Sequence, residues 1–476
     1  MSEKELSRRQ FLKAMGGGAL AVGAMAAGCS NPNEVQAEGF TLGEVPTDQM
    51  TYRESNNGTK VSLLGYGFMR LPNVNGAPYG KDDADLDQER INELVDYAIA
   101  HGVNLFDTSP RYCKGHSEHS LGIALSRHDR SEYLVSTKLS NQSAAIWHKE
   151  GSVKMFEDSL KELQVDYIDF YMLHCVGLPG KDLDGNDVEP MDALKRRFFD
   201  NGIMDFLVEQ REKGRIRHLG FSYHGDVKVF DYLLSLHDQY HWDHVLIESN
   251  YSDWHHATTD ANAEYLYGEL EKRNIPVFVM EPLLGGRLAE MPEFAVKEMK
   301  SREPQQSVAS WAFRFAGTMP RILTVLSGMT YMEHLQDNIR TYSPLKPLSE
   351  EEIKMLLEIA DTYAKFSLVP CTGCQYCMPC PYGIDIPGIF RHYNKCVNDG
   401  QMVVTDGEET PDRKAFRKAR KVFLVGYDRS IPRLRQADHC IGCGRCVAEC
   451  PQSIKIPEEM VRINAYADEL KRSLME

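Results

Sequence analysis

The sequence lacks long hydrophobic runs and any excess of positive charge. After the first thirty positions there is no run of about 18 consecutive strongly apolar residues, so the body of the chain predicts no membrane span. Lys and Arg number 54 against 69 Asp and Glu, which gives a formal net charge of −15. This negative charge repels phosphate backbones and anionic membrane surfaces, and we therefore expect no nucleic-acid partner.

Length and composition describe an ordinary globular protein. The sequence has 476 residues, of which 42% are hydrophobic and 26% charged. Chains of this length divide into domains of about 150 residues each. Collagen-like, mucin-like and wholly disordered classes are excluded, and two or three domains are expected.

Residues 1–30 resemble an export signal. The string SRRQFLK at 7–13 precedes a weakly apolar stretch of Gly and Ala at 14–28, which is similar to a twin-arginine signal. The resemblance implies recognition by the Tat translocase and export of the folded chain to the periplasm. The string AAGC at 26–29 also resembles a lipoprotein cleavage box with Ala in place of Leu, which leaves a lipid anchor on Cys29 open. Residues 31–58 are expected to form a linker.

Residues 59–345 alternate short β-rich runs with helical stretches. At 91–99, for example, apolar residues recur at i, i+3, i+4, i+7 and i+8, and a glycine follows at position 102. Eight strand and helix pairs in this length predict an α/β fold, a (β/α)8 TIM barrel of about 250 residues. The candidate strands are 61–68, 103–108, 133–139, 168–174, 216–222, 245–251, 276–283 and 322–327.

A doubly wound open sheet is the alternative fold for this pattern. That fold normally places the motif Gly-x-Gly-x-x-Gly after its first strand. Gly65 and Gly67 lie near the end of the first candidate strand here, but Arg70 stands where the third glycine is required. The barrel is therefore preferred.

Four polar residues stand at the ends of consecutive candidate strands, where the reacting groups of a barrel enzyme lie. Asp107 and Tyr112 follow the second strand, Lys138 ends the third, and His174 ends the fourth. A buried Tyr, a solvated Lys, a capping Asp or a core His is, taken singly, more often structural. Together the four form a candidate proton-transfer set.

This set resembles the tetrad of the aldo/keto reductases, and the resemblance covers the whole barrel. It implies that Tyr112 protonates a carbonyl oxygen as hydride arrives at carbon, and that Lys138 lowers the pKa of Tyr112. It further implies that Asp107 pairs with Lys138 and that His174 orients the substrate, a small carbonyl compound or alcohol. A phenol of pKa about 10 needs a neighbouring cation to act as an acid and base near neutral pH.

The nicotinamide contacts of that family are matched at fewer positions. Aldo/keto reductases usually have Ser-Asn after strand five and Gln on strand six, where this chain has Ser222 followed by Tyr, and Glu248. The turn after the eighth strand has no Lys or Arg to bind a 2′-phosphate, so NADPH selection is not predicted. NAD(P)H stays a candidate cofactor, and a flavin is left open although no flavin motif is found. The candidate cofactor-binding residues are Ser222, Glu248, Gly285, Gly286, Ser327, Gly328 and Asn338.

Eight of the twelve cysteines form two tight groups. The spacing between neighbours in each group is two or three residues, and a proline follows each last cysteine. Closely spaced thiols of this kind are expected to be metal ligands rather than a disulfide framework. Two zinc sites with four thiolate ligands each are the alternative, although these usually use paired Cys-x-x-Cys motifs. The groups are Cys371, Cys374, Cys377 and Cys380, and Cys440, Cys443, Cys446 and Cys450.

The second group matches the bacterial ferredoxin motif, and the pair of groups resembles a two-cluster ferredoxin. The resemblance implies two [4Fe-4S] clusters with exchanged fourth ligands. The first would be held by Cys371, Cys374, Cys377 and Cys450, and the second by Cys440, Cys443, Cys446 and Cys380. We expect a connecting helix at 346–368, begun by the capping box SEEE at 349–352, and a small, mostly α-helical ferredoxin-like iron-sulfur domain at 369–470.

Three functions are compatible with these two halves. The favoured one is an exported oxidoreductase of the aldo/keto reductase type that exchanges electrons through its clusters with a membrane or periplasmic redox partner. The second is an ordinary NAD(P)H-dependent reductase whose clusters are structural. The third is a non-catalytic electron carrier on a degenerate barrel, which the intact set of four residues disfavours.

Overall fold

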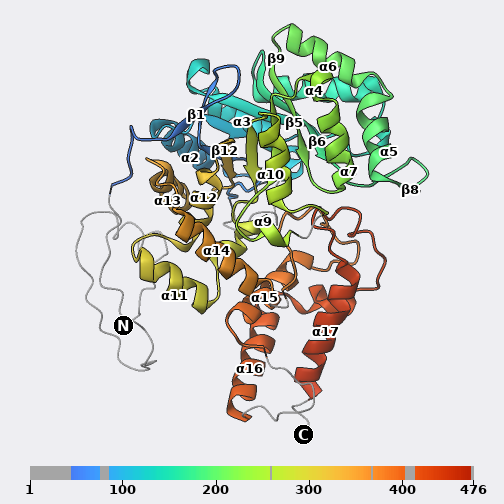
Figure 1. Cartoon of the computed structure of the whole chain (residues 1–476). Coiled ribbons are helices and arrows are strands. Elements are labelled where there is room, and N and C mark those ends of the chain that lie inside the picture. Colours follow the sequence, from blue (N-terminus) through green and yellow to red (C-terminus); the bar gives the residue numbers. More distant parts are fainter. Residues whose placement is uncertain (1–43, 75–84, 258–259, 366–367, 403–412, 473–476) are drawn as a thin grey trace, which may run out of the picture. The chain divides into compact units, whose positions relative to one another are not determined.

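The computed structural model describes residues 44–74, 85–257, 260–365, 368–402 and 413–472. The twin-arginine string, Cys29 and residues 31–43 of the expected linker lie outside this part of the chain. Residues Val45–Glu476 form one compact unit, whose elements are labelled in Figure 1. Among the described residues, no helix combines the length and apolar character needed to cross a bilayer.

Eight parallel strands close into a barrel in the order β3-β4-β5-β6-β9-β10-β11-β12. Each overlaps one of the eight strands expected from the sequence, so the predicted barrel is confirmed. The strands are β3 Leu64–Gly67, β4 Leu105–Asp107, β5 Leu134–Leu139, β6 Ile168–Val176, β9 Ile216–Tyr223, β10 His244–Glu248, β11 Val277–Met280 and β12 Ile322–Ser327.

Two small antiparallel pairs accompany the barrel. Strand β1 (Tyr52–Glu54) lies within the expected linker and pairs with β2 (Lys60–Ser62), so ordered structure begins before the predicted barrel boundary. Strands β7 (Gly180–Lys181) and β8 (Asp187–Val188) form a hairpin in the loop that follows β6.

Helices follow the strands around the outside of the barrel, as Figure 1 shows. Helix α2 illustrates why: the Asp87 side chain accepts a hydrogen bond from the Arg90 amide at its start, and the buried face carries Ile91, Leu94 and Ala98. The barrel helices are α2 Gln88–Ala100, α3 Ser117–Leu125, α4 Lys149–Leu163, α5 Pro190–Leu194, α6 Ile203–Glu212, α7 Val227–Ser235, α8 His237–Tyr240, α9 Asp253–His256, α10 Ala263–Lys272, α11 Glu293–Arg302, α12 Val308–Thr318 and α13 Met332–Tyr342. Single turns lie at η1 Tyr112–Gly115, η2 Arg130–Glu132, η3 Ala144–Ile146, η4 Lys195–Phe199 and η5 Leu284–Ala289.

The barrel has two apolar layers. The larger one lies between the strands and the surrounding helices, and a smaller cluster of Phe170, Met172, Leu246 and Phe278 belongs to the strands themselves. Packing on both faces explains why the strand sequences are near-continuous apolar runs rather than alternating ones.

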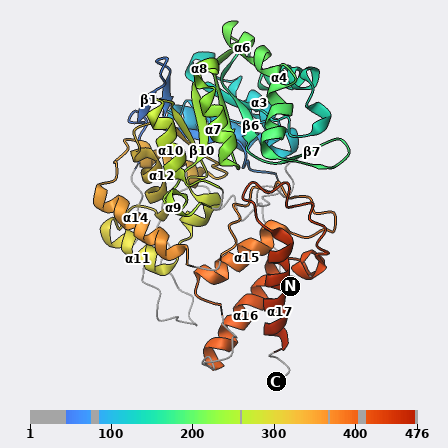
Figure 2. The ribbon, with the colours of Figure 1, turned by 45° about the vertical axis from the view of Figure 1, so that its right-hand side comes forward.

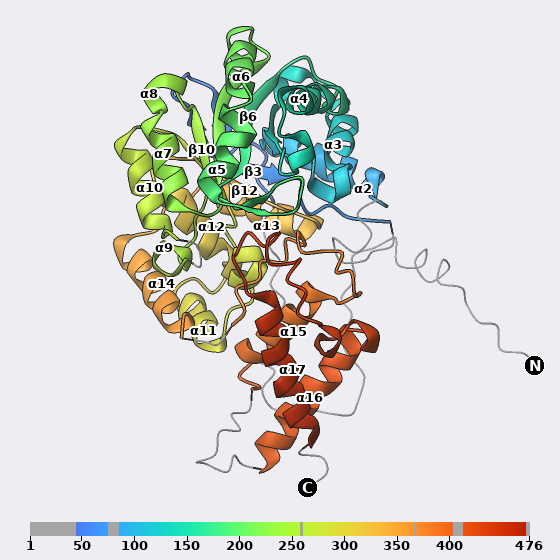
Figure 3. The same cartoon turned by 90° about the vertical axis from the view of Figure 1, so that its right-hand side faces the viewer.

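The C-terminal part is helical, as expected. Helix α14 (Glu350–Tyr363) begins with the predicted capping box, in which Ser349 and Glu352 each accept a hydrogen bond from the other's backbone amide. Helices α15 (Ile386–Asn398), α16 (Arg413–Ser430) and α17 (Ile456–Arg472) follow, with short turns at η6 (Arg433–Arg435) and η7 (Ala437–His439). They share a core of their own, and Figures 2 and 3 show the three helices together beside the barrel.

The cysteine-rich loops of this helical part contact the barrel where its strands end. The Arg70 guanidinium donates to the Thr372 carbonyl at 2.7 Å, and the Gln452 amide donates to Glu248 at 2.7 Å. Arg70 follows β3 and Glu248 ends β10. The helical part therefore covers the C-terminal end of the barrel, the face that carries the active sites of such folds.

Glu118 makes the stability of the barrel depend on pH. Burial raises its pKa to about 7 from an ordinary 4.5, against hydrogen bonds from Thr137 and Ser159. The folded chain thus binds more protons than the unfolded chain between these pH values, so the free energy of unfolding falls as pH rises through them. Glu118→Gln should abolish this fall and exceed the parent in stability by on the order of 2 kcal/mol at about pH 8. Urea unfolding of the parent and of Glu118→Gln at about pH 5 and about pH 8 tests this prediction. Glu93→Gln, at an exposed position, is the control. Equal pH dependence of the free energy of unfolding in all three proteins would contradict the prediction.

Alanine variants of two neighbouring glycines test how tightly the barrel and the helical part pack against each other. Both have positive φ, +71° at Gly285 and +100° at Gly286, so both alanine variants carry similar backbone strain. A Cβ on Gly285 would stand 2.2 Å from the Thr372 carbonyl oxygen, whereas one on Gly286 meets nothing within 4 Å. The free energy of unfolding, measured with urea, should therefore fall by about 2 kcal/mol more in Gly285→Ala than in Gly286→Ala. Equal losses would show that this contact is not tight.

Candidate active site

Asp107 and Lys138 form a buried ion pair at the ends of β4 and β5. The Lys138 ammonium donates to Asp107 Oδ1 at 2.6 Å and to the Thr108 carbonyl at 2.8 Å, and its side chain is 0% exposed. Ser136 donates to the other carboxylate oxygen at 2.7 Å. A buried charge needs such partners, since leaving one unpaired costs several kcal/mol. The pairing expected from the sequence is thus present.

Tyr112 lies beside this pair on η1, with the Lys138 ammonium 4.9 Å from its ring centroid. Burial, followed by the influence of Tyr376 and Asp107, raises the pKa of Tyr112 well above its ordinary value. The shift is opposite in direction to the lowering by Lys138 that the family resemblance implies, so that expectation is wrong for this site. The phenol is therefore protonated at neutral pH and suited to donate a proton.

His174 completes the set, with its ring centroid 6.0 Å from that of Tyr112. Its Nδ1 is 2.6 Å from the Ser140 hydroxyl oxygen, and burial lowers its pKa to about 4. The imidazole is therefore neutral near pH 7. The structure brings all four tetrad candidates together at one end of the barrel.

Cys175 and His224 join this group, and the only signal for them in the sequence was the position of Cys175 next to His174. The pairing of β6 with β9 shifts register between Leu173 and Val176, and Cys175 has φ +54°. Burial raises the pKa of the Cys175 thiol, but the two imidazoles outweigh burial and hold that pKa well below its usual value. The thiol and one nitrogen of each ring, His174 and His224, lie within 4.8 Å of one another.

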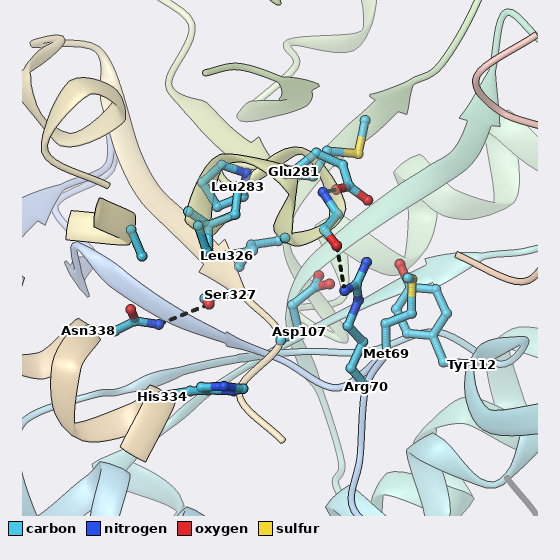
Figure 4. A pocket seen from close by; sticks show the side chains of 18 of the residues that line it. Met69, Arg70, Asp107, Tyr112, Glu281, Leu283, Leu326, Ser327, His334 and Asn338 are labelled. Atoms are coloured by element: carbon cyan, nitrogen blue, oxygen red, sulfur yellow. Dashed lines mark hydrogen bonds between the residues drawn. The ribbon is translucent and has the colours of Figure 1, made fainter. Parts of the chain in front are cut away.

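A cleft of about 510 Å³ runs from the tetrad to the start of α13. Figure 4 shows Asn338 and Ser327 on one side, Tyr112 on the other, and Asp107 and Arg70 between them. The Asn338 amide donates to the Ser327 hydroxyl oxygen at 3.0 Å, and Arg70 donates to the Gly285 carbonyl at 3.2 Å.

The seven candidate cofactor-binding residues divide between this cleft and its surroundings. Two of them, Ser222 and Glu248, do not line the cleft. The Ser222 hydroxyl accepts a hydrogen bond from the Cys175 amide at 3.0 Å, and the Glu248 carboxyl accepts one from the Gln452 side-chain amide. The five that line the cleft are Gly285, Gly286, Ser327, Gly328 and Asn338.

A second cavity of about 630 Å³ lies on the other side of the tetrad, between the loops after β5 and β6. Cys175 and Tyr376 line it, together with Gln142 and Trp147. Within the described residues, neither the Gln142 amide nor the indole N–H of Trp147 has a hydrogen-bond partner. Buried polar groups without partners are costly, so these groups are available to a polar ligand.

The eight clustered thiols gather into two sets of four. Cys371, Cys374, Cys377 and Cys450 line one small cavity. Burial raises the pKa of the Cys446 thiol, and the neighbouring thiols of Cys440, Cys443 and Cys380 raise it further. These four thiols form the other set. Each set therefore draws its fourth thiol from the other sequence group, and four thiols around one centre fit a [4Fe-4S] cluster, which would supply one-electron chemistry there. Cys396 lies apart on α15, next to His392.

Comparisons with known proteins match each part of the chain. Residues 63–361 match the aldo/keto reductase family. The chain belongs to the aldo/keto reductase family. Residues 370–455 match the 4Fe-4S dicluster domain. The protein is thus an iron-sulfur oxidoreductase, an aldo/keto reductase barrel fused to a dicluster domain.

Individual relatives agree with this assignment. L-Galactose dehydrogenase of Arabidopsis thaliana is 28% identical over 64% of this chain and 92% of its own length. The uncharacterized oxidoreductase YqkF of Bacillus subtilis is 24% identical over 55% of this chain and 85% of its own length. Among solved structures, the thermostable aldo-keto reductase Tm1743 has a TM-score of 0.50 at 22% identity, covering 65% of this chain and all of its own. Aldo-keto reductase AKR11C1 of Bacillus halodurans also has a TM-score of 0.50 at 21% identity, covering 65% of this chain and 96% of its own.

The cleft beside the tetrad fits a nicotinamide dinucleotide in size and lining. Its glycine-rich side at Gly285 and Gly286 allows close approach of phosphates to the backbone. Glu290, Glu333 and Asp337 also line it, and these carboxylates would repel a 2′-phosphate. The residues present therefore fit NAD(H) better than NADP(H), and such a cofactor would supply hydride at the tetrad.

The exchanged fourth ligands can be tested by comparing four single variants. Cys450→Ser and Cys374→Ser should lose the same cluster and leave the same residual EPR signal in reduced, anaerobic protein. Cys380→Ser and Cys443→Ser should both leave the other signal, while Cys396→Ser keeps both. A residual signal shared by Cys450→Ser and Cys443→Ser would show that each cluster is held by one sequence group alone.

Proposed function

We propose that this protein interconverts a carbonyl compound and an alcohol, with Tyr112 as proton donor and acceptor and with electrons exchanged through its two clusters. One observation carries the proposal: the loop that holds the first thiol set lies against the tetrad. Tyr112 lines one cavity together with Cys374 and Tyr376, and Tyr376 stands between Cys374 and Cys377 in the sequence.

The chain's own residues account for the proton chemistry. Tyr112 is protonated at neutral pH and lies between the buried Lys138 ammonium and His174. A carbonyl oxygen bound there would receive its proton from the phenol, and the adjacent ammonium would stabilise the phenolate that remains. Neutral His174, fixed by Ser140, would orient the oxygen through its other ring nitrogen.

The arrangement of the thiol sets gives a direction to the electron path. Reduction of one carbonyl requires two electrons and two protons, delivered as a hydride at carbon and a proton at oxygen. Each cluster would pass one electron at a time, so a bound two-electron carrier, NAD(H) or a flavin, would have to combine two electrons with a proton from solvent into the hydride, while Tyr112 supplies the other proton. The set around Cys374 lies next to the barrel, whereas Cys443 in the other set is exposed. Electrons would therefore pass between the tetrad and the molecular surface through the inner and then the outer set.

Export to the periplasm is part of the proposal. It is supported by the twin-arginine string at 7–13 and by the need to insert clusters before transport. The Tat translocase would carry the folded protein, and a membrane or periplasmic redox partner would dock near the outer thiol set. The proposal leaves lipidation of Cys29 open.

The substrate class we propose is a polyhydroxylated carbonyl compound or alcohol, such as a sugar. The partnerless Gln142 amide and Trp147 indole N–H in the second cavity support this, because they offer donors and an acceptor to ligand hydroxyls. The similarity to L-galactose dehydrogenase points to the same class.

A second function is favoured by the 510 Å³ cleft, which fits NAD(H). In this alternative, the protein is an NADH-dependent aldo/keto reductase whose clusters are structural. The same four tetrad residues would serve, and only the source of reducing equivalents differs.

The two functions are separated by the electron donor. Reduction of a panel of sugar-derived carbonyl compounds is followed with reduced viologen, with NADH and with NADPH, under anaerobic conditions. We expect viologen-driven reduction without added nicotinamide, reduced at least about 100-fold in Tyr112→Phe, which lacks the proton donor. The outer-set variant Cys443→Ser should also lose viologen-driven activity. The exposed Tyr382→Phe serves as the control.

The contrary result is equally clear. Turnover with NADH that survives in Cys443→Ser, together with no viologen-driven reduction, would establish the second function in place of the first. Full activity of Tyr112→Phe with every donor would reject both.

A further inference from the structure

The mouth of the barrel holds a group of three metal-binding side chains that neither proposed function needs in full. His174, Cys175 and His224 each offer one ligand atom, and these atoms lie within 4.8 Å of one another. All three side chains are buried, with exposures of 1%, 1% and 9%. They are separate from the eight thiols assigned to the clusters.

The backbone is distorted in a way that produces this convergence. Consecutive residues on a strand normally point to opposite faces, so His174 and Cys175 should diverge. The register shift between Leu173 and Val176, together with φ +54° at Cys175, turns the thiol toward the same side as His174. A left-handed conformation is unfavourable for a residue other than glycine, and such strain is concentrated at functional sites.

Each histidine already has its Nδ1 engaged. Nδ1 of His174 is 2.6 Å from the Ser140 hydroxyl oxygen, and Nδ1 of His224 is 3.2 Å from the Ser222 carbonyl oxygen. The second ring nitrogen, Nε2, is therefore the one available to a ligand. Histidines that bind metals typically hold their other nitrogen in this way, which fixes the ring orientation.

The backbone on which these ligands stand is anchored as well. The Cys175 amide donates to the Ser222 hydroxyl oxygen at 3.0 Å. The buried Arg197 guanidinium donates to the Cys175 carbonyl at 3.1 Å and also to the His174 carbonyl. The three donors are thus held by fixed contacts rather than by loose loop residues.

We propose that His174, Cys175 and His224 bind one divalent ion of the Zn²⁺ class, with its fourth position open. Two imidazoles and one thiolate are a donor set that suits Zn²⁺, and three protein ligands leave one site for water or substrate. Binding would release to solvent the proton held by the Cys175 thiol and the His224 imidazole, since the metal needs both groups deprotonated. The open position would face the cavities that His224 and Cys175 line, where the ion would polarise a carbonyl oxygen. The inference stands on the donor set and does not rest on the proposed function. With the ion bound, Nε2 of His174 is a metal ligand, and the ion would orient the substrate oxygen in place of the imidazole.

Metal analysis of the anaerobic holoprotein tests this site. After equilibration with zinc chloride and desalting, we expect one zinc per chain in addition to the iron of two clusters. Cys175→Ser and His224→Gln should each lose this zinc, with affinity at least about 100-fold weaker, while their iron content is unchanged. Cys396→Ser is the matched control, because Cys396 is also buried beside a histidine.

A spectroscopic readout separates this site from the cluster thiols. Co²⁺ added to the holoprotein should give a high-spin cobalt EPR signal that is lost in Cys175→Ser and kept in Cys396→Ser. Unchanged iron content in the variants shows that they fold and retain their clusters. No bound zinc or cobalt, or equal amounts in Cys175→Ser and Cys396→Ser, would overturn the proposal.

Discussion

The contact between the first cysteine loop and the end of the barrel determines how the two parts of this protein work together. Arg70 reaches from the first barrel strand to the Thr372 carbonyl, and Gly285 packs so closely on Thr372 that a side chain would not fit. These contacts place the thiols around Cys374 next to Tyr112. Without them the chain would be an aldo/keto reductase barrel and a dicluster domain joined by a helix, and the electron path proposed above would lack its contact with the tetrad.

The same contact changes the structural role that can be assigned to Gly285 and Gly286. In the sequence both were candidates for phosphate approach. In the structure Gly285 is required by the neighbouring domain, whereas Gly286 has open space around it. Packing against Thr372 therefore accounts for Gly285, and phosphate approach stays a prediction for this glycine pair.

The fold and the two thiol groups could be predicted from the sequence because each depends on local patterns, whereas the roles of the tetrad candidates came from the resemblance to aldo/keto reductases. Barrel strands are continuous apolar runs, the tetrad candidates stand at the ends of consecutive strands, and the cysteines recur at fixed intervals. The Cys175 and His224 contact could not be predicted in this way. It depends on a register shift within β6 and on a left-handed residue, and neither leaves a pattern in the sequence. The direction of the Tyr112 pKa shift likewise follows from burial and then from Tyr376 and Asp107, a combination that only the folded chain shows.

Glu248 shows how burial can restore a property that a sequence difference would otherwise remove. Aldo/keto reductases usually have a glutamine at this position, and a charged glutamate would be unfavourable beside buried thiols. Burial, then the neighbouring carboxylates of Asp253 and Glu281, raise the pKa of Glu248 to about 8. The side chain is therefore mostly neutral near pH 7, and a neutral carboxylic acid is close to glutamine in size and in its hydrogen-bonding groups. It accepts from Gln452, a residue of the dicluster domain. Replacement of the amide by an acid thus keeps a neutral group at the barrel mouth while the position becomes a contact with the iron-sulfur domain.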